Sequence, residues 1–413
     1  MKNALHRGWG VFLLFLTAAA GAPAQELGPI TGFSVSGLKR TKPHVAEQPL
    51  RQFLGREASL VDPNDVRAAV MDTGILEPIS VEIVDAGDGS GKILAVLVRE
   101  KWSIFPLPMF FIGSGGMSLG GFFIDSNAFG LNDKMILGGM YSSKSWMVMT
   151  MYINTPDRAG FFGWNIGGFY SREERTDTDQ KNRAVRRFNL DSINASAGIN
   201  YPLSDILTPS LNFSFYDRIL RETGDPLEAP ETGAMALGVS PGISLRKTDW
   251  DGYLLSRQSI SLEYTYTIGI RYPSSHSASI LAAYERSLIP GFKAGLRTGI
   301  VYAPRAASLF ESPPSSVQID ILPRSFSARN YAGASADVEK YLFQFSFGTL
   351  SALLSYQIVW SEGPLLGSRF DHGVMGAVRF YLSRLAIPAL GFGMAYNVAA
   401  RYFQCSFNIG ISL

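Results

Sequence analysis

Residue types that often carry catalytic chemistry are sparse and scattered in this 413-residue sequence. The four histidines, His6, His44, His276 and His372, stand far apart and lack any metal-ligand spacing, and Cys405 is the only cysteine. A single thiol supplies neither a disulfide framework nor a thiolate metal cluster within one chain. No Ser/His/Asp or paired-carboxylate arrangement stands out. We therefore expect no enzyme and neither a metal site nor a cofactor.

Two other clusters have both a chemical and a structural interpretation. The charged run at residues 172–175, with Arg183, Arg186 and Arg187, could bind a ligand, but a solvated loop tip is the interpretation we favour. The glycine pairs at 115–116 and 167–168 could suggest phosphate binding. Neither pair precedes a helix-like segment or a Gly-Lys-Ser/Thr ending, so we interpret them as glycines of strands.

The composition favours a membrane β-barrel. Charged residues make up 17% of the chain, against a typical value of about 25%, while aromatic residues reach 12% and glycine accounts for 42 positions. Few charges and many aromatics suit a wall that faces lipid. A secreted β-sandwich or β-helix is the alternative on composition alone. The net charge of +2 gives no indication of a nucleic-acid partner.

The N-terminus predicts export. Lys2 and Arg7 precede an apolar run at residues 11–16, and Ala22-Pro23-Ala24 follows as a cleavage site. We predict a signal peptide at 1–24, a buried N-terminal helix being the alternative. The rest of the sequence contains no run of about 18 apolar residues, so transmembrane helices are not expected.

Residues 25–102 predict a small α+β domain in the order strand, helix, helix, strand, strand. Residues 30–38 alternate as a strand, and Thr41 is expected to cap a helix that runs to Leu54. A second helix starts at Asp62 and Pro63 and stops at Gly74. Strands are expected at 79–84 and 93–98.

From 103 to 413 the helical periodicity is replaced by alternation of apolar and polar residues. Such a strand also suits a sandwich, but repetition over most of the chain favours a barrel wall. About sixteen segments can be placed, an even number as single-chain barrels require. Turns after even-numbered segments are mostly short, and loops after odd-numbered ones are longer, including 172–187, 220–234 and 303–334. The segments lie near 104–113, 117–126, 133–143, 145–154, 160–171, 186–201, 206–219, 235–249, 256–270, 275–287, 292–302, 335–347, 349–360, 370–382, 388–397 and 401–413.

Four short motifs carry a family resemblance. They are residues 35–41, 71–74 and 98–101 in the first region and 125–133 at the second barrel hairpin. With the domain order, they make the chain similar to the BamA/TamA superfamily of outer-membrane insertases and translocators, of the surface-antigen type with a single POTRA domain. The resemblance implies a transmembrane all-β fold: a 16-stranded antiparallel barrel in the outer membrane of a Gram-negative-type bacterium. One β-α-α-β-β POTRA domain would lie in the periplasm.

The family's signature is an Arg-Gly-aromatic tip on the sixth surface loop, folded back into the lumen. By resemblance, that tip is formed by Arg329, Asn330, Tyr331 and Gly333. Asn330 replaces the family's glycine, and Asn tolerates positive φ better than most residues. Relatives pair the arginine with an acidic residue on the thirteenth strand, but residues 354–358 contain none, which leaves Asp337 and Glu339 as candidate partners. The alternative is that Arg329 is a solvated loop residue.

The resemblance also implies a weak seam between the first and last strands. The expected first strand contains Pro106 and Pro108, which lack a ladder donor, although prolines also mark ordinary sheet edges. The seam residues of the last strand are expected to be Phe403, Phe407, Ile409, Ile411 and Leu413.

The implied function is insertion or translocation of polypeptides, with strands of a client added at the open edge of the barrel. The implied partners are outer-membrane lipid, unfolded client polypeptides, and periplasmic chaperones or accessory subunits bound to the POTRA domain, with no nucleic acid. A solute-conducting porin with a docking POTRA domain is the alternative. A structural or lipid-handling role is a third interpretation.

Overall fold

A computed structural model describes residues 28–87, 91–113, 116–143, 145–154, 161–221, 233–251, 254–364, 367–382 and 390–409. The predicted signal peptide at 1–24 lies outside the described residues. None of the helices in these ranges combines the length and the apolar character that crossing a membrane requires.

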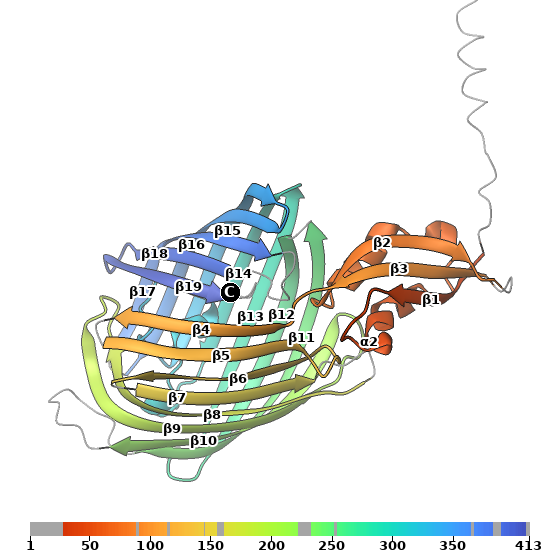
Figure 1. Cartoon of the computed structure of the whole chain (residues 1–413). Helices are drawn as coiled ribbons and strands as arrows, with labels where there is room; N and C mark the ends of the chain where they lie inside the picture. The colour runs from red at the N-terminus through yellow and green to blue at the C-terminus, as the bar shows by residue number, and fades with distance from the viewer. Residues whose placement is uncertain are drawn as a thin grey trace, which may run out of the picture.

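The first part of the chain forms a small α+β unit beside one end of the barrel (Figure 1). Its sheet has the order β1-β3-β2, with β1 parallel to β3 and β2 antiparallel to it. The helical segments lie between β1 and β2 in sequence. The elements are β1 (Ile30–Ser36), α2 (Pro43–Glu47), η1 (Gln48–Phe53), η2 (Ala58–Leu60), α3 (Pro63–Met71), β2 (Leu76–Asp85) and β3 (Lys92–Glu100).

The two predicted helix starts have different outcomes. Asp62 caps α3 as expected, because its Oδ1 accepts from the Asn64 N–H at 2.8 Å and Pro63 occupies the first turn. Thr41 does not cap α2: the helix begins after Lys42 and continues as the 3-10 helix η1. The Thr41 hydroxyl instead accepts a hydrogen bond from Asn127 of the barrel at 2.9 Å. A tertiary contact has replaced the local cap.

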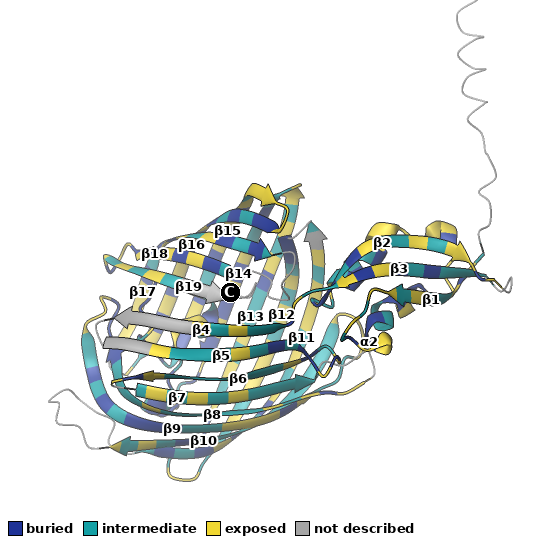
Figure 2. Cartoon of the chain, viewed as in Figure 1, coloured by how far each residue is buried: buried dark blue, intermediate teal, exposed yellow. Residues whose placement is uncertain are grey.

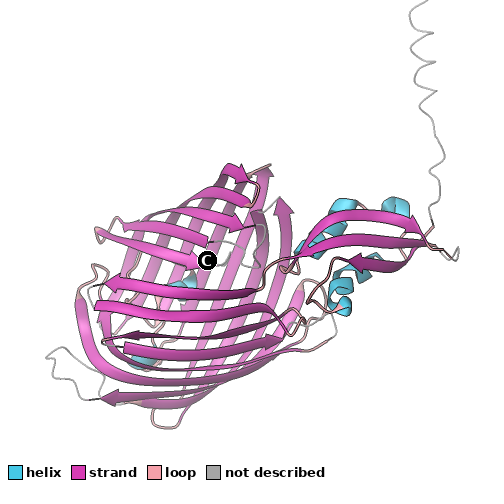
Figure 3. Ribbon diagram, viewed as in Figure 1, coloured by secondary structure: helices cyan, strands magenta, loops and turns pink. Residues whose placement is uncertain are grey.

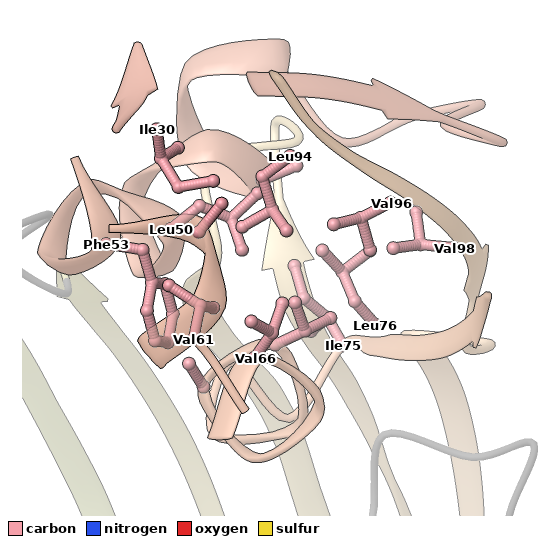
Figure 4. Packing of buried hydrophobic residues seen from close by; sticks show 14 residues of the cluster. Ile30, Leu50, Phe53, Val61, Val66, Ile75, Leu76, Leu94, Val96 and Val98 are labelled. Carbon is pink, nitrogen blue, oxygen red and sulfur yellow. The ribbon is translucent and has the colours of Figure 1, made fainter. Parts of the chain in front are cut away.

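A compact apolar core holds this unit together (Figure 4). Leu50 of η1 and Val66 of α3 are fully buried against Leu76 and Leu94 of the sheet. Each such side chain contributes about 1.5–3 kcal/mol of burial free energy.

The barrel is one antiparallel sheet of sixteen strands in sequence order from β4 to β19. Each predicted barrel segment corresponds to a strand over its described residues, the end of the last segment at 410–413 lying outside them, and the fold class is as expected. The strands are β4 (Ile104–Gly113), β5 (Gly116–Ala128), β6 (Asp133–Ser142), β7 (Ser145–Asn154), β8 (Gly163–Thr178), β9 (Ala184–Asn200), β10 (Leu207–Arg221), β11 (Ala234–Asp251), β12 (Leu254–Gly269), β13 (Ser275–Ile289), β14 (Phe292–Tyr302), β15 (Asn330–Phe345), β16 (Gly348–Gly363), β17 (Gly367–Leu382), β18 (Leu390–Asn397) and β19 (Tyr402–Ile409).

The expectation that residues 172–187 form a solvated loop is wrong. The strands β8 and β9 extend through most of this run as a long hairpin. Its charges are paired locally: Arg172 Nε lies 2.9 Å from Asp191 Oδ1, and Arg175 Nε lies 2.8 Å from Asp177 Oδ1. These ion pairs let a charged sequence continue as strand.

Along many strands of the barrel wall, exposed residues alternate with more covered ones (Figure 2). In β16, Leu354 is 58% exposed and Tyr356 48%, whereas Ser355 is 1% and Gln357 0%. An apolar outer face and a polar inner face match a wall between lipid and a lumen. Figure 3 shows the helices gathered in the N-terminal unit, with only short helical turns within the barrel.

Candidate functional site

The residues between β14 and β15, 303–329, form a loop that we call the inner loop. It contains two short helical turns, η3 (Ser308–Phe310) and η4 (Pro314–Val317). It contacts the covered faces of β14–β19 on one side and the β8–β9 hairpin on the other, so it crosses the lumen. A loop between the eleventh and twelfth barrel strands was expected to fold inward, and the structure places it there.

The inner loop is held against the wall by its apolar segment. Val317, Ile319, Ile321, Leu322 and Phe326 are each at most 3% exposed. They form one cluster with inward residues of the strands, among them Val301, Tyr331, Leu353, Val359 and Met375. Apolar side chains are rare in solvated loops, so this run was a sequence signal for a packed loop.

A strip of wall without side chains receives the loop. Gly299 of β14 and Gly333 of β15 are cross-strand partners. A Cβ on Gly299 would lie 2.7 Å from the Val317 Cα, and one on Gly333 would lie 2.8 Å from the Ile319 Cγ1. Both glycines are therefore required for the close approach of the loop.

Polar contacts tie the middle of the loop to two strands. The Asp320 N–H donates to Gln357 Oε1 of β16 at 2.8 Å, and Gln357 Nε2 lies 3.4 Å from Asp320 Oδ2. Gln404 of β19 donates through Nε2 to the carbonyls of Asp320 and Leu322, the latter at 2.7 Å. The thirteenth barrel strand does contact the loop, but through an amide and not through a carboxylate. The loop is also connected to the last strand.

The other side of the loop is connected to the β8–β9 hairpin. The Thr178 N–H donates to the Ser325 carbonyl at 3.1 Å, and Arg186 Nη2 donates to the Ser308 carbonyl at 3.2 Å. The buried Glu311 carboxylate lies 3.5 Å from both Arg186 and Arg329. Burial raises the pKa of Glu311, and the two arginine charges oppose that rise.

The four residues expected at the loop tip do not lie there. Asn330, Tyr331 and Gly333 belong to strand β15, and Arg329 immediately precedes it. The Asn330 backbone is extended, and the left-handed residue of the loop is Gln318, with φ of 60°. The side chain of Asn330 closes the loop base by accepting from Ala303 N–H and donating to Glu362, each at 2.9 Å. Tyr331 donates to the Ser312 carbonyl at 3.0 Å.

Asp337 and Glu339 are not the partners of Arg329. Asp337 pairs with Arg297 at 2.6 Å. Glu339 accepts from Arg379 at 3.1 Å and from Tyr381 at 2.7 Å, deep inside the barrel. Both carboxylates therefore belong to an ionic network on the inner wall, and Arg329 pairs with Glu311 of the loop itself.

The two end strands of the sheet form a seam. Among the described residues, β4 pairs only with β5 and β19 only with β18. Pro106 and Pro108 lie exposed on β4, and Phe403 on β19 is 55% exposed. Phe407 and Ile409 also belong to β19, while Ile411 and Leu413 lie outside the described residues. Within the described part of the chain, each of these strands has one edge without a pairing partner, the kind of edge to which another strand can add.

A joint connects the N-terminal unit to the barrel. Glu100 accepts backbone hydrogen bonds from Lys39, Arg40 and Thr41 at 2.8–3.0 Å. Burial disfavours its charge, but these donors outweigh burial and hold the pKa of Glu100 below its usual range. The ordered Arg40 then reaches the barrel, where its Nη1 donates to Asp125 Oδ1 at 3.0 Å.

The motifs that carried the family resemblance meet at this joint. Gly130 of the β5–β6 turn accepts from the Lys42 N–H at 2.9 Å, and a Cβ there would lie 2.2 Å from the Arg40 carbonyl oxygen. A cleft of about 280 Å³ beside it is lined by Asp72 and Thr73 of the unit and Asn132 of the turn. Residues 35–41, 71–74, 98–101 and 125–133 thus all contribute to one contact region.

No protein-family model and no curated protein sequence matches the chain. Solved structures do. BamA from Haemophilus ducreyi lacking POTRA domains 1-3 is 12% identical with a TM-score of 0.51, covering 92% of this chain and 83% of its own. The chain folds as a BamA-type barrel.

CdiB gives the same result in two organisms. The Escherichia coli protein has a TM-score of 0.62 at 13% identity, and covers 93% of this chain and 75% of its own. The Acinetobacter baumannii protein has a TM-score of 0.59 at 12% identity, and the match covers 93% of this chain and 74% of that protein. At these low sequence identities, the likeness shows the BamA-type fold alone.

In the described residues of this BamA-type barrel, no three His, Cys, Asp or Glu side chains are grouped to hold an ion. Its ionic clusters pair carboxylates with arginine or lysine, as in Glu339 with Arg379 and Lys293. Within the described part of the chain, the features that could carry a function are the seam between β4 and β19, the inner loop connected to β19, and the jointed N-terminal unit.

Proposed function

We propose that this chain inserts or translocates polypeptides at the outer membrane of a Gram-negative-type bacterium, using the seam between β4 and β19. The unpaired seam carries this proposal. An edge strand offers rows of N–H and C=O groups, which must be paired in hydrocarbon, so an incoming strand can add there. The proline pair of β4 supports a seam that closes poorly, because neither residue has an N–H to offer.

The inner loop gives the seam a point of control. Gln404 lies on the seam strand β19 and donates to two carbonyls of the loop. Movement of the loop would therefore change the contacts of the seam strand β19. In this proposal the position of the loop sets how freely β19 separates from β4.

The N-terminal unit would act as a single POTRA domain, spanning residues 25–102 after removal of a signal peptide at 1–24, with the barrel at 103–413. It would lie in the periplasm and receive unfolded clients, chaperones or accessory subunits. The edge strands β1 and β2 of its sheet support this role, because each can accept an added strand. The joint at Arg40 and Asp125 keeps the unit close to the barrel mouth.

A solute-conducting porin makes a different prediction for planar bilayers. The inner loop and the Glu339 network occupy the lumen, so we expect a small and unsteady conductance from the purified chain. Replacing residues 304–328 with a short linker should make the conductance larger and steadier. A large, steady conductance in the unaltered chain would favour the porin.

Depletion in the source organism tests the proposal. Outer-membrane and secreted proteins are quantified after the chain is depleted and again after it is restored. We expect a specific subset to fall and recover. An unchanged set in both membrane and medium would contradict insertion and translocation alike.

A further inference from the structure

Strands β4–β7 carry an apolar inner surface that, unlike the inward apolar residues of β14–β18, is not packed against the inner loop. Most of its large inward side chains are aliphatic, aromatic or methionine, and each of these is only partly covered. The described members of this apolar wall are Phe105, Leu107, Phe122, Ile124, Ile136, Met140, Met147, Met149, Met151 and Ile153.

Contacts across the lumen fix the direction in which these side chains point. Phe310 of the inner loop lies 5.8 Å from the guanidinium of Arg218, which also lies 6.0 Å from the ring of Phe169. Phe169 is the cross-strand partner of Met149 and therefore shares its face. The register carries this face through β6 and β5 to Leu107 and Phe105 of β4.

Large side chains of the apolar wall lie over glycines. A Cβ on Gly138 would lie 2.4 Å from Phe122 Cδ1, and one on Gly120 would lie 2.8 Å from Met140 Cγ. The rings and thioethers therefore lie along the wall and leave a broad apolar surface. Methionine is typical of surfaces that adapt to varied apolar partners.

Positively charged side chains lie at one end of this surface. Lys134 is the cross-strand partner of Ile153, at the end of β6 next to the joint. Arg246 pairs with Ser259 and Thr248 pairs with Arg257, so the two arginines lie on the same face of the neighbouring strands β11 and β12. Arg246 also interacts electrostatically with Lys134, while the carboxylate of Glu285 on β13 acts on Arg257. The Arg257 Nε is buried without a hydrogen-bond partner. Lys134, Arg246 and Arg257 thus face the lumen beside the apolar wall, with the Glu285 carboxylate acting on Arg257.

The apolar wall is also continuous with the seam. Phe105 and Leu107 belong to β4, whose other edge is unpaired among the described residues. Lipid outside the barrel is thus separated from this wall only by the seam. An apolar surface that faces water is unfavourable, and contact with an acyl chain would remove that surface from water.

We propose that the apolar wall and the Lys134–Arg246–Arg257 cluster form a lumenal site for an anionic phospholipid. Its acyl chains lie on the methionine-rich wall, and its phosphate lies among the three cations. The lipid enters through the seam, from the leaflet next to the N-terminal unit. This site does not depend on polypeptide transport, since it uses the apolar wall and the cations alone.

Quenching by brominated lipid tests the site in the full-length protein. Single cysteines are introduced in a Cys405→Ser background at Met149 on the apolar wall and at Ser279 on the polar wall of β13, and each is labelled with bimane. The variants are reconstituted with phosphatidylglycerol or phosphatidylcholine brominated on the acyl chains. We expect strong quenching at position 149, little at 279, and a preference for phosphatidylglycerol.

A charge variant tests the headgroup contact. Because each cation near an anionic lipid contributes about 1 kcal/mol, Lys134→Gln with Arg246→Gln should reduce the preference for phosphatidylglycerol by about tenfold or more. Quenching at 149 no stronger than at 279 would overturn the proposal, as would equal quenching by both lipids. A third outcome would also overturn the proposal: a label at 149 that brominated lipid does not quench but that an added unfolded polypeptide shields. That outcome would assign the apolar wall to a client polypeptide.

Discussion

Gly299 and Gly333 matter because they lack side chains. The strip they form lets the backbone of the inner loop approach the wall at Val317 and Ile319. Gly333 was predicted as part of an arginine-bearing tip, and its observed role is to receive the loop. A glycine in a strand often marks such an approach of another backbone.

Gly299→Ala should loosen the inner loop. The added methyl group would lie 2.7 Å from the Val317 Cα, and overpacking of this kind costs about 1–3 kcal/mol. In a Cys405→Ser background, a cysteine placed at the buried Leu322 should then react with maleimide about tenfold faster. Gly376→Ala is the matched control, because nothing lies within 4 Å of the methyl group that this residue would gain. Equal labelling rates in the two variants would refute the role of Gly299.

Glu100 gives the joint a dependence on pH. Its pKa is lowered from 4.5 in the folded chain, so its contribution is present above about pH 4.5 and is lost as the pH falls through the lower folded value. Melting temperatures of the unaltered chain and of Glu100→Gln should differ at pH 7 and converge on acidification. A difference that stayed constant down to about pH 3 would show that the carboxylate charge does not hold residues 39–41.

Single-residue roles were predicted less well than residue neighbourhoods. Arg329 was predicted at the tip of the sixth loop, but it lies directly before β15, because strand register decides where the loop ends. Register depends on pairing with β14 and β16, which local sequence does not contain. Gln357 and Gln404 were missed for the same reason, because their partners lie 37 and more positions away.

At the scale of elements, the inner loop connects parts of the barrel that are far apart in sequence. It reaches Thr178 of β8 on one side and Gln404 of β19 on the other. A loop held at both ends restrains the last strand, which has a pairing partner on one side only among the described residues.

Gln404→Leu should free β19. Two loop carbonyls would lose their donor, and a buried unsatisfied group costs about 1–3 kcal/mol. Hydrogen exchange of the peptide spanning 402–409 should accelerate about tenfold, whereas Gln258→Leu, on the exposed face of β12, should leave it unchanged. An unaltered rate in Gln404→Leu would mean that the loop does not restrain the seam strand.

The strands themselves could be predicted because alternation reports a wall with two different environments. The sixteen segments follow from this alternation. The start of α3 could also be predicted, because Asp62 and Pro63 are typical of a helix N-terminus. The ends of β8 and β9 could not be predicted, because Arg172 and Asp191 stabilise strand pairing only once they are opposite each other. The helix cap at Thr41 failed because its hydroxyl contacts the barrel.

At the scale of the whole molecule, three features lie along one route. The jointed N-terminal unit adjoins the barrel end where β4 begins, the seam runs along β4 and β19, and the inner loop contacts β19 from within (Figure 1). A client bound at the unit would meet an unpaired strand edge next. The seam is therefore the place at which this proposed route can be tested most directly.

Site-specific photo-crosslinking at the seam is the most direct measurement. A photoreactive residue is placed at Phe403 on β19 and, as control, at Phe213 on β10, whose side chains are 55% and 50% exposed. In growing cells, we expect adducts with newly made outer-membrane or secreted polypeptides at 403 and none at 213. No polypeptide adduct at 403, or the same adducts at both positions, would contradict a seam that receives clients.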